Sequence, residues 1–173
     1  MIPSLNPKPI VDELKRNKLV FRQLLEYLPS SVYMWKPSPD AWCLLEVICH
    51  LRDEEREDFG ARVKHVLANS ELTLPSIDPV GWVTERNYIE QDYETVLANF
   101  LTERENSVRW LEQLANPAWD NTYKHPKLGD LTAKMFLSNW LAHDYLHIRQ
   151  IMKLKYGFLK SSTGEDLSYA GTW

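Results

Sequence analysis

Two of the five histidines, His143 and His147, stand four residues apart in the segment LAHDYLHIRQI. On a helix, this spacing brings two side chains to one face, with their Cβ atoms about 6 Å apart. Two imidazoles so placed can bind one divalent transition metal, and zinc, the first choice here, takes nitrogen ligands at about 2.0 to 2.1 Å. Five histidines scattered at random would give such a pair in roughly one chain in nine, so its surroundings must decide.

The pair lies within the apolar stripe of its helix. At about 100° per residue, Trp140, Ile151 and Leu154 fall within an arc of about 80° that also holds His143 and His147. An unsatisfied buried polar group costs about 1 to 3 kcal/mol, so both imidazoles need partners for their ring nitrogens. Because a metal ion would supply one partner to each, this position strengthens the metal hypothesis.

A third histidine, His50, lies in an earlier helical segment, at the edge of its apolar arc. Ligand sites in helical bundles are commonly built from inward residues of facing helices. Three protein ligands with an open fourth position are typical of a catalytic zinc site rather than a structural one. We therefore predict a metal site at His50, His143 and His147. His65 and His125 have charged or loop surroundings, so we assign both to the surface.

Four other residues stand close enough in sequence to support these ligands. Glu54, one turn after His50, is expected to be a fourth ligand, an acceptor for metal-bound water, or simply a solvated surface carboxylate. Metal-bound histidines usually donate their second ring nitrogen to an acceptor. Asp53, Asp144 and Gln150 are the candidates for that role, and helix faces do not decide among them.

The two cysteines, Cys43 and Cys49, are six residues apart within one expected helix. Their side chains point in directions about 120° apart around the helix, so they cannot easily form a disulfide or share a metal. We predict that both are small buried hydrophobic residues in a reducing compartment.

Four segments show the spacing of amphipathic helices, and each apolar stripe must be buried against the others. We therefore predict an all-α fold, a four-helix bundle. The third segment is expected to place Ile89 in the core, whereas Asn17 and Arg104 interrupt the apolar stripes of the first and third. The expected helices cover residues 10–28, 41–69, 88–115 and 131–157.

Capping and helix-breaking residues set the expected ends of these helices. Pro29 should stop the first helix, and Asp40 should cap the second. Thr132 or Asp130 should cap the fourth, which closes at Gly157.

The connections between the helices differ in length. Residues 70–87 form a long connection that can run the length of the bundle, so the relative direction of the second and third helices stays open. Trp82 in this connection could wall a pocket. Residues 118–130 are expected to be a loop, and the tail 161–173, which ends in aromatic residues, is expected to pack back on the bundle.

Length and composition indicate one intracellular domain over residues 1–173, with 44% hydrophobic and 25% charged residues. The net charge of −4 is spread without a basic stripe, which argues against nucleic-acid binding. No apolar stretch is long enough to cross a bilayer, and the start lacks a signal-peptide pattern. We therefore expect a cytoplasmic protein with neither a nucleic acid nor a membrane as its partner.

Several motifs in order resemble the DinB-like superfamily, also known through its YfiT-like members. They are CHLRDEEREDF, DPVGW followed by RNYIEQD, LGDLTAKMFLSNW and, above all, LAHDYLHIRQI. The likeness extends from about Trp35 to the terminal YAGTW. It implies a four-helix bundle in which His50, His143 and His147 hold zinc, nickel or manganese, and it makes a homodimer plausible.

The same resemblance suggests an activity. Characterised relatives use a low-molecular-weight thiol, such as bacillithiol, mycothiol or glutathione, for S-transfer or isomerisation. We therefore expect a metal-dependent thiol transferase or, as a close second, a hydrolase, in which the ion lowers the pKa of a bound thiol or water. The sequence identifies neither catalytic residues nor thiol-binding residues.

Two other interpretations stay open. The chain could be non-enzymatic, either as a bundle whose metal is structural or as a stress-related binding module with a vestigial site. Alternatively, the three histidines could be core residues that are satisfied by protein hydrogen bonds without a metal.

Overall fold

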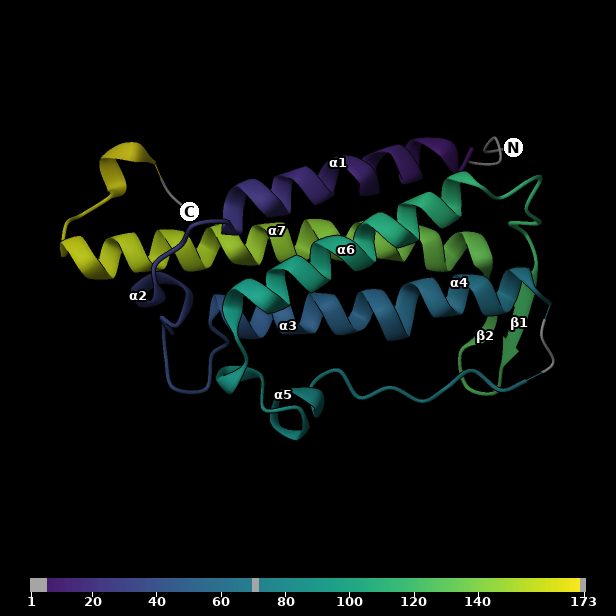
Figure 1. Ribbon diagram of the computed structural model, residues 1–173, viewed down its shortest axis with the longest axis horizontal. Helices are drawn as coiled ribbons and strands as arrows, with labels where there is room; N and C mark the ends of the chain where they lie inside the picture. Colours follow the sequence, from purple (N-terminus) through teal and green to yellow (C-terminus); the bar gives the residue numbers. More distant parts are fainter. Residues whose placement is uncertain (1–5, 70–71, 172–173) are drawn as a thin grey trace.

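The computed structural model describes residues 6–69 and 72–171, and four long helical stretches dominate it (Figure 1). The second stretch is continuous but changes type, because a π-helical segment joins two α-helices. The stretches are α1 (Lys8–Leu25), α3 (Leu44–Glu54) with η1 (Glu55–Phe59) and α4 (Gly60–Leu67), α6 (Tyr93–Glu112), and α7 (Ala133–Thr163).

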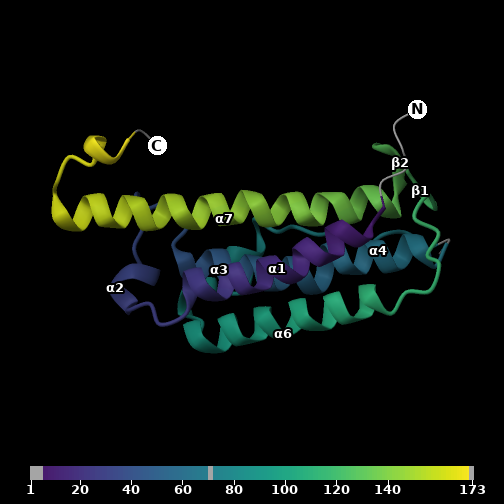
Figure 2. The same ribbon diagram turned by 90° about the horizontal axis from the view of Figure 1, so that it is seen from above.

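The four stretches form a bundle in which each has two close neighbours. Helix α6 packs against α1 and α3, and α7 packs against α1 and α4. The long connection after α4 returns along the bundle before α6 begins, so α3, α4 and α6 point the same way (Figure 1). Helices α1 and α7 run in the opposite direction (Figures 1 and 2). The structure thus confirms the predicted bundle. It also shows that the second and third predicted helices, whose relative direction the sequence left open, are parallel.

The remaining elements are short. The expected loop at 118–130 instead contains an antiparallel hairpin, with Thr122 opposite Thr132 and His125 opposite Gly129. Each strand spans only four residues, too few for strand periodicity to stand out from a loop. These elements are α2 (Ser30–Tyr33), α5 (Trp82–Glu85), η2 (Tyr88–Glu90), β1 (Thr122–His125), β2 (Gly129–Thr132) and η3 (Ser168–Ala170).

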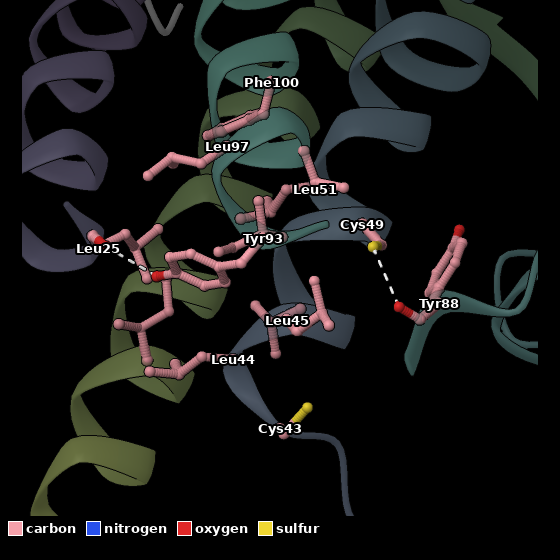
Figure 3. Packing of buried hydrophobic residues seen from close by; sticks show 14 of the residues in the cluster. Leu25, Cys43, Leu44, Leu45, Cys49, Leu51, Tyr88, Tyr93, Leu97 and Phe100 are labelled. Carbon is pink, nitrogen blue, oxygen red and sulfur yellow. Dashed lines mark hydrogen bonds between the residues drawn. The ribbon is translucent and has the colours of Figure 1, made fainter. Parts of the chain in front are cut away.

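Both cysteines lie in the core as free thiols, as the sequence predicts (Figure 3). The Cys49 thiol contacts the carbonyl oxygen of Tyr88 at 3.8 Å, and burial raises the pKa of Cys49 to about 12. The same cluster ties α6 to α1, because the hydroxyl of Tyr93 donates to the carbonyl of Leu25 at 2.8 Å. Neither thiol is therefore poised to act as a nucleophile.

Two helix starts differ from the predictions. Helix α3 begins after Cys43, not after Asp40, because the Glu46 carboxylate accepts the Cys43 amide at 2.8 Å and closes the first turn. Helix α6 begins after Asp92, whose carboxylate accepts the Thr95 amide. The expected start of α6 at residue 88 is a separate 3₁₀ turn, which leaves Ile89 36% exposed rather than in the core. The predicted Thr132 cap of α7 is confirmed.

Two helix ends also differ. Helix α1 stops at Leu25, ahead of Pro29, because Tyr27 adopts a left-handed conformation with φ of 60°. Helix α7 continues past Gly157 and ends at Thr163, where it is followed by Gly164, whose φ of 69° suits a residue without Cβ.

The described part of the tail, up to residue 171, does not pack back on the bundle: it is largely exposed, and the Tyr169 side chain is fully so. Its last two residues, including Trp173, lie outside the described residues. Among the described helices, none combines the length and apolarity needed to cross a membrane.

Candidate metal centre

The three predicted histidines converge at the contact between α3 and α7. The Nε2 atom of His143 lies 3.2 Å from Nε2 of His50 and 3.0 Å from Nε2 of His147. Nitrogen ligands at about 2.0 to 2.1 Å from a tetrahedral zinc ion lie about 3.3 Å apart, close to this arrangement. His50 and His147 are buried, and His143 is partly exposed, so the cluster reaches the surface on the His143 side.

The ring protons show why this cluster fits a cation. A neutral imidazole nitrogen carries either one proton or one lone pair in the ring plane, so it cannot donate and accept at once. The central Nε2 of His143 can therefore offer at most one proton to be shared between the other two nitrogens. A cation between three lone pairs would satisfy all of them without a proton, so the donor set fits a divalent transition metal.

The electrostatics keep the imidazoles neutral, the state in which they can bind a metal. Burial, followed by repulsion from His147, lowers the pKa of His50 to about 3. Burial, followed by repulsion from the other two imidazoles and from Arg104, lowers the pKa of His143 to about 2. Burial also lowers the pKa of His147.

Of the three candidates for orienting the ligands, only Gln150 contacts one. Its Oε1 lies 2.8 Å from Nδ1 of His147, so Nδ1 carries the proton and Nε2 is left with a lone pair. Asp53 and Asp144 are engaged elsewhere, and Nδ1 of His50 has no hydrogen-bond partner among the described residues.

Asp144 belongs to a buried ionic network directly behind the cluster. The guanidinium of Arg104 donates to Asp144 at 2.7 Å from two nitrogens, and to Glu55 at 3.0 and 2.8 Å. Trp140 Nε1 donates to Glu55, and Asn17 Nδ2 donates to Asp144. Both interruptions of the apolar stripes, Asn17 and Arg104, therefore meet here. The network joins all four helical stretches and fixes the residue next to His143.

Glu54 is buried rather than a solvated surface carboxylate, at 4% exposure. Burial and a hydrogen bond with the carboxyl group of Asp58 raise the pKa of Glu54 to about 8. Glu54 lies in a row with His50, Asp58 and Arg62, spaced four residues apart. Both ends of the row contact α7: His50 contacts His143, and Arg62 lies 5.8 Å from the ring centre of Phe136. Within this row, Glu54 is one turn from His50.

The π-helical segment η1 shapes this row. It widens the turn between Glu55 and Phe59, and its residues point inward in two directions. Glu55 reaches the Arg104 network, whereas the ring of Phe59 lies 4.9 Å from that of His143. Such π-bulges occur frequently at functional sites. The sequence carries no pattern that distinguishes this segment from the surrounding α-helix.

A second network ties the long connection to α3. The Asp53 carboxylate accepts hydrogen bonds from Arg86 at 2.7 Å and from the hydroxyl of Tyr88 at 2.8 Å. Arg86 also pairs with Glu57 and lies 4.1 Å from the ring centre of Trp82. Trp82 itself is buried in the core cluster. Asp53 therefore holds the connection in place and does not orient His50.

The two remaining histidines lie away from the cluster. The ring of His65, in α4, packs edge-on against Tyr123. His125 ends β1, and its Nδ1 accepts the backbone amides of Lys127 and Leu128 in the hairpin turn. Among the described residues, the cluster of possible metal ligands comprises only His50, His143 and His147.

The fold and the cluster define a class of protein: a four-helix bundle with three histidines gathered from two neighbouring antiparallel helices. Residues 13–151 match the family model of the DinB superfamily. The chain therefore belongs to the DinB superfamily, as its motifs indicate.

Among solved structures, the chain is similar to YfiT from Bacillus subtilis, with a TM-score of 0.77 at 18% sequence identity. The alignment covers 96% of this chain and 94% of that protein. YfiT is described as a probable metal-dependent hydrolase with an unusual four-helix bundle topology. At this identity the likeness shows the fold. A comparison with curated proteins finds no match.

Proposed function

We propose that the chain is a metal-dependent enzyme that acts on a small molecule, with His50, His143 and His147 as the ligands of a divalent transition metal. The observation that carries this proposal is the convergence of three Nε2 atoms at 3.0 and 3.2 Å around His143. Membership of the DinB superfamily and the description of YfiT support it. Zinc is the first choice, followed by nickel and manganese.

The reaction we favour is transfer of a low-molecular-weight thiol to an electrophile, and hydrolysis is the close alternative. A bound divalent metal supplies Lewis acidity, which lowers the pKa of a thiol or a water molecule at an open coordination position. The chain has two cysteines and both are buried in the core, so a thiol nucleophile would come from a cosubstrate.

We assign Glu54 the role of the base that accepts the proton of this nucleophile. It lies one turn from His50, and in the metal-free protein its pKa of about 8 is close to the pH at which a general acid or base works best. The side chain of Asp58 forms a hydrogen bond with Glu54, and Arg62 pairs with Asp58. In its ionised form, the Glu54 carboxylate would accept the proton of the thiol or water, which would then attack the electrophile and displace its leaving group.

Metal analysis tests the first part of this proposal. Protein purified without chelators or nickel resin should hold about one equivalent of metal, and added zinc should raise the melting temperature of stripped protein. His147→Ala should lose the metal, whereas His125→Ala, outside the cluster, should keep it. Less than about half an equivalent, with no shift in melting temperature on adding zinc, would contradict the metal site.

Two assays separate the reactions. Glutathione with 1-chloro-2,4-dinitrobenzene reports thiol transfer, and p-nitrophenyl acetate reports hydrolysis. If His147→Ala stays folded but loses either activity, the site is catalytic. If metal loss unfolds the bundle, the metal is structural, as the non-enzymatic alternative requires. A homodimer and a cytoplasmic location remain predictions.

A further inference from the structure

A cavity of about 420 Å³ opens beside the histidine cluster, between the segment that precedes α3 and the C-terminal half of α7. Its walls include Trp42, whose ring centre lies 5.1 Å from that of His50. They also include Gln150, whose Oε1 pairs with Nδ1 of His147. Two of the three clustered imidazoles therefore contact residues that line this cavity.

The walls of the cavity are mostly flat and apolar. Trp35 and Trp42 supply two indoles, and Leu154 supplies an aliphatic surface. The indole of Trp35 lies so close to α7 that a Cβ at Gly157 would be 2.9 Å from it. Its ring also packs edge-on against Phe158, with 6.1 Å between the ring centres. The absence of a side chain at Gly157 thus lets the Trp35 indole lie directly against the helix.

The charged residues that line the cavity are both lysines, Lys153 and Lys160, and no carboxylate lines it. They stand seven residues apart on α7, so they share one face and lie about two helical turns apart. Among the ion pairs of the described residues, none includes Lys153. Lys160 interacts electrostatically with Asp166, which lies outside the cavity lining. The cavity therefore combines indole walls with a positive rim.

We propose that this cavity binds the substrate of the metal centre, and that the substrate is a flat apolar molecule carrying a carboxylate or a similar anionic group. The role as a substrate site rests on the proposed function, whereas binding of such an anion does not. The indoles contact the apolar body, and Lys153 or Lys160 pairs with the anionic group. The volume is within the range of about 300 to 1,000 Å³ that is usual for small-molecule sites.

Calorimetric titration with 2-naphthoate tests the proposal, with neutral 2-naphthamide as the matched probe. The protein is first stripped of metal with a chelator, so that the carboxylate cannot bind through an ion. Naphthoate should bind more tightly than naphthamide. The double variant Lys153→Met, Lys160→Met should weaken naphthoate about three- to tenfold and leave naphthamide unchanged. A matched double variant in the hairpin, Lys124→Met with Lys127→Met, should change neither.

A second variant tests the apolar walls. Gly157→Ala should displace the Trp35 indole and weaken both probes by a similar factor. The helix should remain intact, because alanine is the better helix former. Circular dichroism checks that the fold is kept. Equal loss of both probes, combined with the charge-selective loss in the lysine variant, supports the assigned cavity.

Three results would overturn the proposal: no binding of either probe at millimolar concentration, equal affinity for both probes, or naphthoate binding that appears only after metal is restored. A protein that holds no metal but still binds naphthoate as expected would refute the proposed function and leave the anion-binding cavity standing. The two failures are therefore distinguishable.

Discussion

The Oε1 atom of Gln150 lies 2.8 Å from Nδ1 of His147, and this contact fixes which nitrogen of His147 faces the cluster. Gln150→Leu removes the acceptor but keeps the size and the helix propensity. We expect the variant to bind zinc about 10- to 100-fold more weakly, the usual effect of losing a partner that orients a ligand. Zinc titration against a competing chelator measures this loss.

Gln23→Leu is the control for that substitution, because Gln23 is exposed on α1, away from the cluster. It should leave zinc affinity unchanged. Unaltered zinc binding in Gln150→Leu would show that the bundle orients His147 without this hydrogen bond.

The buried network around Arg104 should control the stability of the bundle. Arg104→Met leaves Glu55 and Asp144 buried without their cation, and breaking a buried pair in this way typically costs about 3 to 5 kcal/mol. Arg109→Met, on the exposed side of α6, should cost less than about 1 kcal/mol, because its ion pair with Glu105 is solvated. Urea denaturation measures both, and equal costs would refute a special role for the network.

The neutral histidines should make the metal-free protein sensitive to acid. His50 and His143 have pKa values of about 3 and 2 in the folded protein, against about 6.5 when unfolded. The unfolded chain therefore binds more protons below pH 6.5, so stability is lost as the pH falls from there towards 3. Each histidine contributes a slope of about 1.4 kcal/mol per pH unit.

Denaturation of stripped protein between pH 6.5 and 4.5 measures this slope. His143→Ala should reduce it by about one proton per molecule, whereas His125→Ala should leave it unchanged. A stability that is flat over this range in the unmodified protein would contradict the neutral cluster.

Glu54 should act in the opposite sense on the metal-free protein. Its pKa is raised from 4.5 to about 8, so the folded state holds a proton that the unfolded state has lost, and stability falls as the pH rises through this window. Glu54→Gln keeps the hydrogen-bonding shape without the charge. We expect it to be more stable than the unmodified protein at pH 8 to 9 and less active when loaded with metal.

Glu94→Gln is the matched control, since Glu94 is exposed on α6. It should change neither the pH dependence nor the activity. A Glu54→Gln variant with full activity would remove Glu54 from the proposed proton transfer and leave the metal site untouched.

The bundle and its histidines could be predicted from the sequence because both depend on local spacing. The apolar stripes fix which face of each helix is buried, and His143 and His147 lie within such a stripe. The relative direction of α3 and α6 could not be predicted, because residues 70–87 are long enough for either arrangement.

The rest of the site depends on contacts between distant residues. Asn17 and Arg104 are visible in the sequence only as interruptions of apolar stripes, and their shared partner Asp144 is separated from Arg104 by 40 positions. Interrupted stripes on two helices were the available signal for a buried network. The burial of Glu54 depends on tertiary packing, whereas its own helix shows only a run of charged residues.

The three clustered histidines are divided unequally along the chain. His50 and His143 are separated by 93 positions, and α7 carries two of the three donors. During synthesis, a ribosome that has completed α1, α3, α4 and α6 has produced one of the three imidazoles. The cluster therefore cannot assemble until α7 has emerged and docked, which makes metal loading a step that follows translation of the first three helical stretches.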